Sequence, residues 1–305
     1  MSTLYTQQDK NVHRTWFLMA IFLVIVVVLG WFISYYYNNP GILVIAVIVA
    51  LIMNIGSYWY SDKISLSLAK AIPADKGQYL DLFNVVENLC ITAGLPMPKI
   101  YIIPDPAPNA FATGRDKEHA AIAVTEGLLG MMNKNELSGV VAHELSHIGN
   151  RDTLLQTVVV VLVGFIAIMA NIFTRSMWLG GGRGGRREND GEGGGQLGVV
   201  LAIVGIVFVI LSPIIAQLIQ MAISRKREFL ADADGALLTR YPEGLASALE
   251  KIQAYDKPMT TANNATAHMY ISNPFGPSAS KGIAKLFMTH PPTEERIAIL
   301  RGMEK

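Results

Sequence analysis

The chain has 305 residues, of which 51% are hydrophobic and 16% charged, and its formal net charge is +1. Its mean hydropathy of +0.35 is too apolar for an ordinary soluble domain, so a membrane protein is the first class to test. The near-neutral charge and the lack of a long basic run indicate no nucleic-acid partner. A lone cysteine, Cys90, excludes an intrachain disulfide framework and is expected to be a small buried residue.

Two long apolar segments lie near the amino terminus, after a tail at residues 1–15 that we expect to be cytoplasmic. Within residues 16–60, the segments Trp16 to Tyr36 and Gly41 to Tyr60 are each long enough to cross a hydrocarbon core of about 30 Å. Aromatic residues gather at their ends, as they do at membrane interfaces. The first segment is too long and bulky for a cleaved signal peptide. The pattern therefore predicts a retained transmembrane hairpin.

Residues 61–152 form the first part of a predicted domain outside the membrane. Two short runs with β-strand composition, Lys99 to Ile103 and Ala120 to Val124, predict a small sheet. The proline-rich stretch between these runs is typical of an ordinary loop when it is considered alone. Because the other elements are helical, the predicted fold class is mainly α with a small β-sheet (α+β), attached to transmembrane helices.

A helix is predicted to begin at Asn133, where an Asn cap is followed three residues later by Glu136. Further along this helix, His143 and His147 are four residues apart and share one face, with Glu144 at its edge. Two imidazoles one turn apart can both reach a single zinc ion, and the glutamate remains available to bind the metal's water. Ordinary polar residues on a surface helix are the alternative. A catalytic site of this kind would need a third protein ligand.

A second apolar pair occupies residues 153–223. One segment runs from Thr153 to Thr174 and the other from Leu197 to Ile223, and each is too long for a buried strand. Residues 175–196 between them are rich in glycine and in charges of both signs, which predicts a flexible linker.

Residues 224–305 form the second part of the predicted domain and contain a candidate third ligand. Glu228 and Asp232 are four residues apart on a predicted helix. Glu228 can bind the metal while Asp232 accepts a hydrogen bond from a ligating histidine. An exposed acidic pair that balances Arg225 to Arg227 is the alternative. The second apolar pair either crosses the membrane twice or does not cross it. In both cases the chain returns to the side it left, so this helix and the His143 helix are expected on the same membrane side.

Basic residues flank the apolar segments at positions that the hairpin arrangement puts on one membrane side: Lys10, Arg14, Lys63, Lys70, and Arg225 to Arg227. The positive-inside rule makes these flanks cytoplasmic, which predicts a multi-pass membrane protein whose domain outside the membrane, with the candidate metal site, lies in the cytoplasm. Three linker residues, Arg183, Arg186 and Arg187, oppose translocation. The second apolar pair therefore either crosses fully or is re-entrant.

Four motifs together point to a known family. The H-E-x-x-H at His143 with E-x-x-x-D at Glu228 is similar to the gluzincin metallopeptidases. The segments "PNAFATG" from Pro108, "SRKREFLAD" from Ser224 and "THPPTEERI" from Thr289 narrow the match. With the membrane layout, the whole chain resembles the HtpX membrane protease family, which is related to the CAAX prenyl endoproteases. The resemblance implies a zincin-like domain, one zinc ion per chain, and hydrolysis of damaged or misassembled membrane proteins in quality control and the stress response.

The resemblance also implies roles for residues outside the metal motifs. His290 would donate to the developing oxyanion, with a surface turn as the alternative, and Arg296 would support an acidic partner. An edge strand beside the metal would hold an extended substrate by main-chain hydrogen bonds. The implied substrate-binding residues of this strand are Asn109, Ala110, Phe111 and Ala112.

The sequence thus predicts a zinc-dependent endopeptidase in which Glu144 is the general base. Its expected partners are membrane-protein and unfolded substrates and the lipid bilayer, and no oligomeric state is indicated. A catalytically inactive scaffold or chaperone-like binder that retains the metal site is the alternative. His13, His119 and His268 lack ligand-like spacing and are expected to be solvated.

Overall fold

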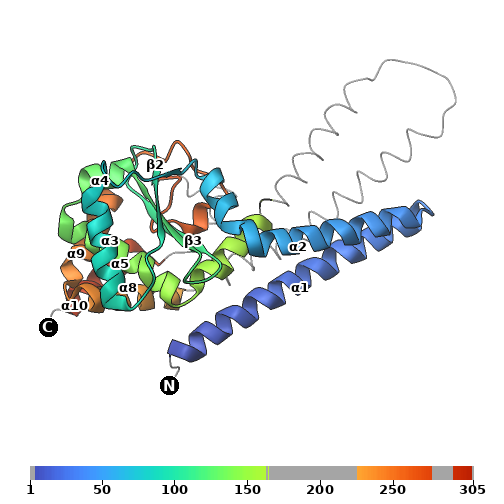
Figure 1. The fold of residues 1–305 in the computed structure, drawn as a ribbon, viewed down its shortest axis with the longest axis horizontal. Coiled ribbons are helices and arrows are strands. Elements are labelled where there is room, and N and C mark those ends of the chain that lie inside the picture. Colours follow the sequence, from blue (N-terminus) through green and yellow to red (C-terminus); the bar gives the residue numbers. More distant parts are fainter. Residues whose placement is uncertain (1–3, 163, 165–224, 277–290, 304–305) are drawn as a thin grey trace, which may run out of the picture.

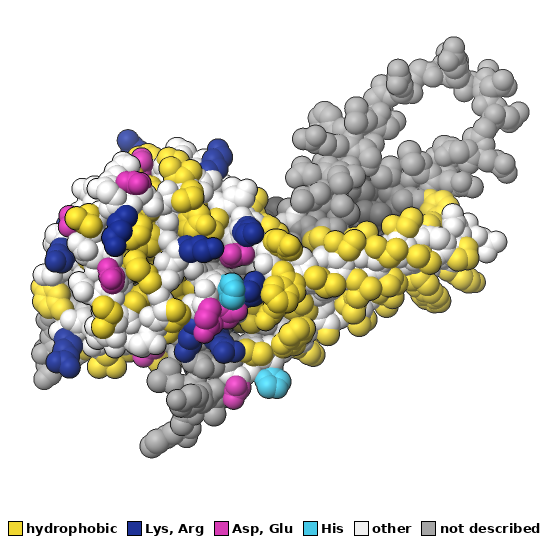
Figure 2. Space-filling view, viewed as in Figure 1, with side chains coloured by type: hydrophobic (Ala, Val, Ile, Leu, Met, Phe, Trp, Pro, Cys, Tyr) yellow, Lys and Arg dark blue, Asp and Glu magenta, His cyan; other side chains and the backbone are white. Residues whose placement is uncertain are grey.

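The structure, a computed structural model, describes residues 4–162, 164, 225–276 and 291–303. Two long helices, α1 (Leu4–Tyr36) and α2 (Pro40–Leu68), lie side by side and project from a compact helical domain (Figure 1). They are the two helices of the described ranges that are long and apolar enough to cross a membrane. Their surface is largely apolar (Figure 2), which is the surface that lipid, but not water, accommodates.

Both long helices extend beyond the predicted spans. α1 begins at Leu4, so most of the predicted tail is helical, and α2 continues to Leu68. The turn between them follows from local chemistry. The Asn39 side chain accepts a hydrogen bond from the Gly41 amide, and Pro40 occupies the first turn, where its missing N–H is not needed.

The sheet has four strands in the order β1-β2-β4-β3. β2 pairs in parallel with β4, whereas β1 pairs antiparallel with β2 and β3 pairs antiparallel with β4. The two predicted strands are confirmed as β2 and β4. The stretch that is typical of a loop when considered alone contains β3, at the sheet edge where the resemblance implied a strand. Gly114 ends β3 at a φ of +134°, and a Cβ there would lie 2.3 Å from the His119 carbonyl oxygen. The strand bounds are β1 (Ile72–Pro73), β2 (Lys99–Ile103), β3 (Ala110–Gly114) and β4 (Ala120–Thr125).

Helices cover the sheet and make the fold mainly α with a small β-sheet, as predicted. The main core lies between the sheet and the helices and includes Cys90, Ile122 and Leu145. The helices and the single 3-10 turn of the described domain are α3 (Leu80–Ala93), α4 (Glu126–Met131), α5 (Lys134–Gly149), α8 (Arg225–Thr239), α9 (Pro242–Ala254), η1 (Ala267–Met269) and α10 (Thr293–Gly302).

α5 is buried along most of its length, and its start confirms the predicted capping motif. The Asn133 side chain accepts from the Glu136 amide at 3.0 Å, and the Glu136 carboxylate accepts from the Asn133 amide at 2.8 Å. A glycine lets a neighbouring helix approach the chemically important part of α5. A Cβ on Gly235 of α8 would lie 3.1 Å from the His143 backbone nitrogen. The two helices therefore pack at nearly backbone contact.

The beginning of the second apolar pair is helical from Asp152 to Leu162. Its side chains are buried inside the protein, where Leu155 and Val159 pack in a cluster with Leu18 of α1 and Phe111 of β3. The remainder of this predicted segment, the 175–196 linker and the 197–223 segment lie outside the described residues, apart from position 164.

Candidate metal centre and active site

α5 presents three polar side chains to one buried site. His143, Glu144 and His147 are 1%, 1% and 5% exposed. The two imidazole Nε2 atoms approach to 3.2 Å, because residues one helical turn apart project in the same direction. Both rings therefore turn the same nitrogen toward one point.

α8 adds a carboxylate to this point. The Glu228 oxygens lie 3.7 Å from His143 Nε2 and 3.6 Å from His147 Nε2, and the Glu228 side chain is buried. One ligand atom from each of these three residues lies within 4.8 Å of the others. The structure thus brings the predicted third ligand to the two histidines across a sequence separation that includes the whole second apolar pair.

The chemistry of these donors fits a metal ion. Buried histidines and carboxylates are costly unless they are paired or coordinate a cation. Two imidazole nitrogens with one carboxylate are the donor set of a catalytic site that keeps one position open. The group His143, His147 and Glu228 can therefore hold a metal ion.

The far side of the His143 ring is held by an acidic residue of α8. Asp232 Oδ1 lies 2.9 Å from His143 Nδ1, and Arg296 of α10 donates to both oxygens of Asp232, at 2.7 and 2.8 Å. Burial alone would raise the pKa of Asp232, but the charge and hydrogen bonds of Arg296 lower it to about 2. The ionised carboxylate keeps the hydrogen of His143 on Nδ1 and leaves Nε2 free for the metal.

His147 has an equivalent partner, Asp152, which we did not identify from the sequence. The Asp152 Oδ2 atom lies 3.1 Å from His147 Nδ1. α5 ends at Gly149, and Arg151 adopts a left-handed φ of 57°, which turns the chain back toward His147. The only sequence signal is an acidic residue five positions after the second histidine. This spacing does not by itself predict a contact, because the contact depends on the turn at Arg151.

Glu144 lies between the metal group and the edge strand. Its carboxylate accepts a hydrogen bond from the Ala112 amide of β3, and burial raises its pKa to about 7. This carboxyl group can therefore exchange a proton near neutral pH.

The four predicted substrate-binding residues lie at or beside the edge strand, but they are buried. The outward-facing carbonyl of Ala110 accepts from the Ile271 amide at 3.0 Å, and the Ala112 amide donates to Glu144. A bound peptide would have to replace the Ile271 contact. Main-chain binding of a substrate at this strand stays a prediction.

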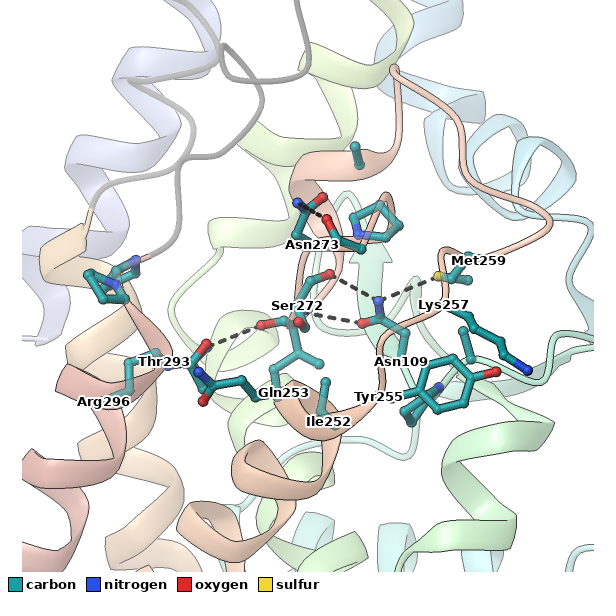
Figure 3. A pocket seen from close by; sticks show the side chains of 18 of the residues that line it. Asn109, Ile252, Gln253, Tyr255, Lys257, Met259, Ser272, Asn273, Thr293 and Arg296 are labelled. Atoms are coloured by element: carbon teal, nitrogen blue, oxygen red, sulfur yellow. Dashed lines mark hydrogen bonds between the residues drawn. The ribbon is translucent and has the colours of Figure 1, made fainter. Parts of the chain in front are cut away.

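A cavity of about 870 Å³ opens next to the buried site. Figure 3 shows Asn109, directly before β3, joined to Ser272 and Met259 by hydrogen bonds on one wall of the cavity, with Arg296 on another wall. The Asn109 amide donates to the Ser272 carbonyl at 2.9 Å, and Arg296 donates to the Ile271 carbonyl at 3.1 Å. Two lining residues thus connect the cavity to the site, because Asn109 directly precedes β3 and Arg296 also donates to Asp232.

The predictions for the remaining histidines have three different outcomes. His290 lies outside the described residues. His13 and His119 are exposed, as expected. The prediction for His268 was wrong, because this residue is fully buried and its Nε2 lies 3.0 Å from the Gln156 carbonyl oxygen. Spacing along the chain could not indicate that contact, which joins the η1 turn to the Asp152–Leu162 helix.

Comparisons with known proteins identify a family and relatives that match nearly the whole chain. The family model described as Peptidase family M48 matches residues 78–304. A protease HtpX homolog of Caldanaerobacter subterraneus is 48% identical over 304 residues, which cover 99% of this chain and 98% of the relative. A protease HtpX homolog of Pyrococcus furiosus is 46% identical over 292 residues, 94% of each chain. The crystal structure of S. mikatae Ste24p is similar with a TM-score of 0.49 and 17% identity, over 97% of this chain and 67% of that chain.

The metal-binding group, the apolar helices and the full-length relatives agree on one class of protein. The chain belongs to peptidase family M48, among the HtpX protease homologues, and is a membrane metalloprotease.

Proposed function

We propose that the protein is a zinc-dependent endopeptidase that holds one zinc ion through His143, His147 and Glu228. The convergence of these three side chains is the observation that carries the proposal. Neighbouring ligand atoms of a tetrahedral zinc ion are about 3.3 Å apart, because each lies about 2.0 to 2.2 Å from the metal. Here the two histidine Nε2 atoms are 3.2 Å apart, Glu228 Oε1 lies 3.6 Å from His147 Nε2, and Glu228 Oε2 lies 3.7 Å from His143 Nε2, so the three groups are close enough to share such an ion.

The protein's own residues supply the proton transfers and the orientation. When bound, zinc polarises the scissile carbonyl and makes a water molecule more acidic. Glu144 takes the proton of the attacking water at its carboxylate and gives it to the leaving amine. Asp232 and Asp152 hold the Nδ1 atoms of the two histidines, and Arg296 keeps Asp232 ionised.

Substrate binding is proposed to use β3 and the cavity beside it. Asn109, Ala110, Phe111 and Ala112 would pair with an extended peptide after the Ile271 segment is displaced. The cavity of about 870 Å³ is large enough for substrate side chains, since ligand sites usually measure about 300 to 1,000 Å³. His290 is proposed to donate to the oxyanion that develops on the carbonyl.

We further propose a cytoplasmic position for the catalytic domain in a multi-pass protein of the cytoplasmic (inner) membrane. The proposed order is a cytoplasmic tail (1–15), a transmembrane hairpin (16–60), the first domain part (61–152), the second apolar pair (153–223) and the second domain part (224–305). The charge distribution around the spans supports this arrangement. The two long apolar helices support the membrane assignment.

The proposed substrates are damaged or misassembled membrane proteins, cleaved in segments that emerge on the cytoplasmic side, as part of quality control in the stress response. The position of the metal group supports this choice, because the Asp152–Leu162 helix that directly follows α5 packs against Phe22 in the apolar part of α1. The active site would therefore lie near the bilayer surface. A catalytically inactive scaffold would have no need of Glu144 in its buried position beside the metal group.

Metal analysis with proteolysis tests the proposal. The purified full chain should contain one zinc ion, cleave casein, lose activity on chelation and recover it with zinc. Glu228→Ala should lose both zinc and cleavage because a ligand is removed. Asp234→Ala is the matched control, since Asp234 joins the same two helices through Ser146 without facing the histidines. Cleavage by a zinc-free protein would contradict the proposal, and zinc binding without any cleavage would favour the scaffold.

A further inference from the structure

Asn11, near the start of α1, is buried although the sequence around it is polar. Only 1% of its surface is exposed. Its side-chain amide donates to Asp152 Oδ1 at 2.7 Å and to the Asn150 carbonyl at 3.2 Å. Its side-chain oxygen accepts from Arg227 of α8 at 3.1 Å. The side chain of Asn11 therefore bonds to the turn after α5 and to the residue before Glu228.

The face of α1 that carries Asn11 packs against the catalytic domain. Asn11, Thr15, Leu18 and Phe22 are all buried, and their spacing of three or four residues places them along one side of the helix. Phe22 packs in a cluster with residues of the Asp152–Leu162 helix. α1 therefore packs on the Asp152–Leu162 helix, and this packing holds Asn11 next to Asp152, the first residue of that helix.

Asp152 connects this contact to the metal group. One carboxylate oxygen, Oδ1, accepts from Asn11 and lies 3.3 Å from Arg227 Nη1, while the other, Oδ2, faces His147 Nδ1 at 3.1 Å. A carboxylate can orient an imidazole only if its own rotation is restrained. Asn11 and Arg227 supply that restraint on the side opposite His147.

We propose that Asn11 is a positioning residue for the metal site and acts on His147 through Asp152. The first membrane helix is then a structural part of the metal centre as well as an anchor. This inference rests on the proposed function, in which His147 is a zinc ligand. A purely anchoring helix would be served at this position by an apolar residue, because a buried amide costs free energy unless its hydrogen bonds are made.

The test measures zinc affinity of the full chain in lipid nanodiscs by competition with a chelator, which does not depend on catalysis. Asn11→Ala should weaken affinity about 3- to 30-fold, less than the about 10- to 100-fold expected for Asp152→Ala, because it acts one contact further from the ligand. Asn11→Leu fills the site without donors and should show a similar loss, even if Asn11→Ala folds poorly.

Thr15→Val is the matched control. Thr15 is equally buried on the same face of α1, but its hydroxyl donates to the Asn11 carbonyl within the helix and, in the part of the chain that the structure describes, not to Asp152. Its zinc affinity should stay within about twofold of the wild type. A loss in Thr15→Val equal to that in the Asn11 variants would assign the effect to general loosening of α1.

A double-mutant cycle separates positioning from packing. If Asn11 acts through Asp152, Asn11→Leu should have little further effect on affinity in an Asp152→Ala background. Wild-type affinity in Asn11→Leu, or an equal loss with and without Asp152, would overturn the inference. If His147→Ala also keeps wild-type zinc affinity, the proposed zinc site itself is wrong. If His147→Ala and Asp152→Ala lose zinc affinity but the Asn11 variants do not, the zinc site stands and the role of Asn11 is rejected.

Discussion

At the scale of single residues, each candidate metal-binding histidine uses its two ring nitrogens differently. The Nε2 atoms of His143 and His147 meet at 3.2 Å, while their Nδ1 atoms face Asp232 and Asp152 at 2.9 and 3.1 Å. Fixing one nitrogen with a carboxylate determines which nitrogen can bind a metal. The proposed catalytic geometry therefore depends on two acidic residues that do not themselves belong to the metal-binding group.

Arg296 is the residue whose removal should show this dependence most clearly. Arg296→Leu leaves the buried Asp232 carboxylate without its cation, and we expect a loss of about 3 to 5 kcal/mol in the free energy of unfolding. Arg301→Leu, in the same helix, removes only exposed ion pairs to Glu243 and Glu250 and should leave stability nearly unchanged. Denaturant unfolding of the three proteins is the measurement. Equal stability of both variants would show that the Arg296 contacts are not structurally important.

The residues of the candidate site were predictable where local spacing carries the information. The helix period predicted that His143, Glu144 and His147 lie together, and the same spacing made Glu228 and Asp232 candidates, whereas Arg296 was indicated only by the resemblance. Asp152 was missed because its contact depends on the left-handed turn at Arg151. Burial of His268 was missed because its partner carbonyl lies 112 positions away in the chain.

At the scale of elements, the site depends on the close packing of α5 and α8. Glu228 reaches the histidines only because Gly235, two turns further along α8, lets the backbones nearly touch. The predicted helices and the two central strands agree with their composition and periodicity. β3 was not identifiable by composition, because Pro106 and Pro108 precede it and its pairing with β4 depends on a partner strand further along the chain.

A methyl group at this helix contact should disturb the metal group. In Gly235→Ala, the new Cβ would lie 3.1 Å from the His143 nitrogen, so the helices must separate by a few tenths of an ångström. We expect weaker zinc binding in chelator competition, because Glu228 moves with α8. Gly130→Ala is the control, since a Cβ there meets no neighbouring atom within 4 Å, and it should bind zinc normally. Unchanged zinc affinity in Gly235→Ala would argue against this role of the contact.

At the scale of the whole molecule, the membrane hairpin and the catalytic domain share buried contacts. Leu18 of α1 and Leu66 of α2 pack in one cluster with Phe111 of the sheet. The hydropathy pattern predicted the two apolar spans and left residues 1–15 as a tail. Hydropathy contains no information about which other elements a helix contacts. The packing of α1 against the domain is therefore a tertiary contact that composition could not predict.

Cysteine labelling tests the orientation of this assembly. In a Cys90→Ala background, which removes the buried thiol, Lys76→Cys should resist membrane-impermeant reagents in intact cells and react after lysis. Pro40→Cys, at the exposed start of α2 beside the turn between the two helices, should react from outside and serves as the matched control. Reaction of Lys76→Cys in intact cells would reverse the proposed topology.

The direct test of the central claim compares zinc content and peptide cleavage in the wild type and Glu144→Gln. The amide keeps the size of the side chain but cannot take a proton from water. The proposed mechanism predicts one zinc ion in both proteins and a loss of about 10²- to 10⁴-fold in the single-turnover cleavage rate of the variant. A cleavage rate in Glu144→Gln equal to that of the wild type, at equal zinc content, would contradict the assignment of Glu144 as the general base and with it the proposed mechanism.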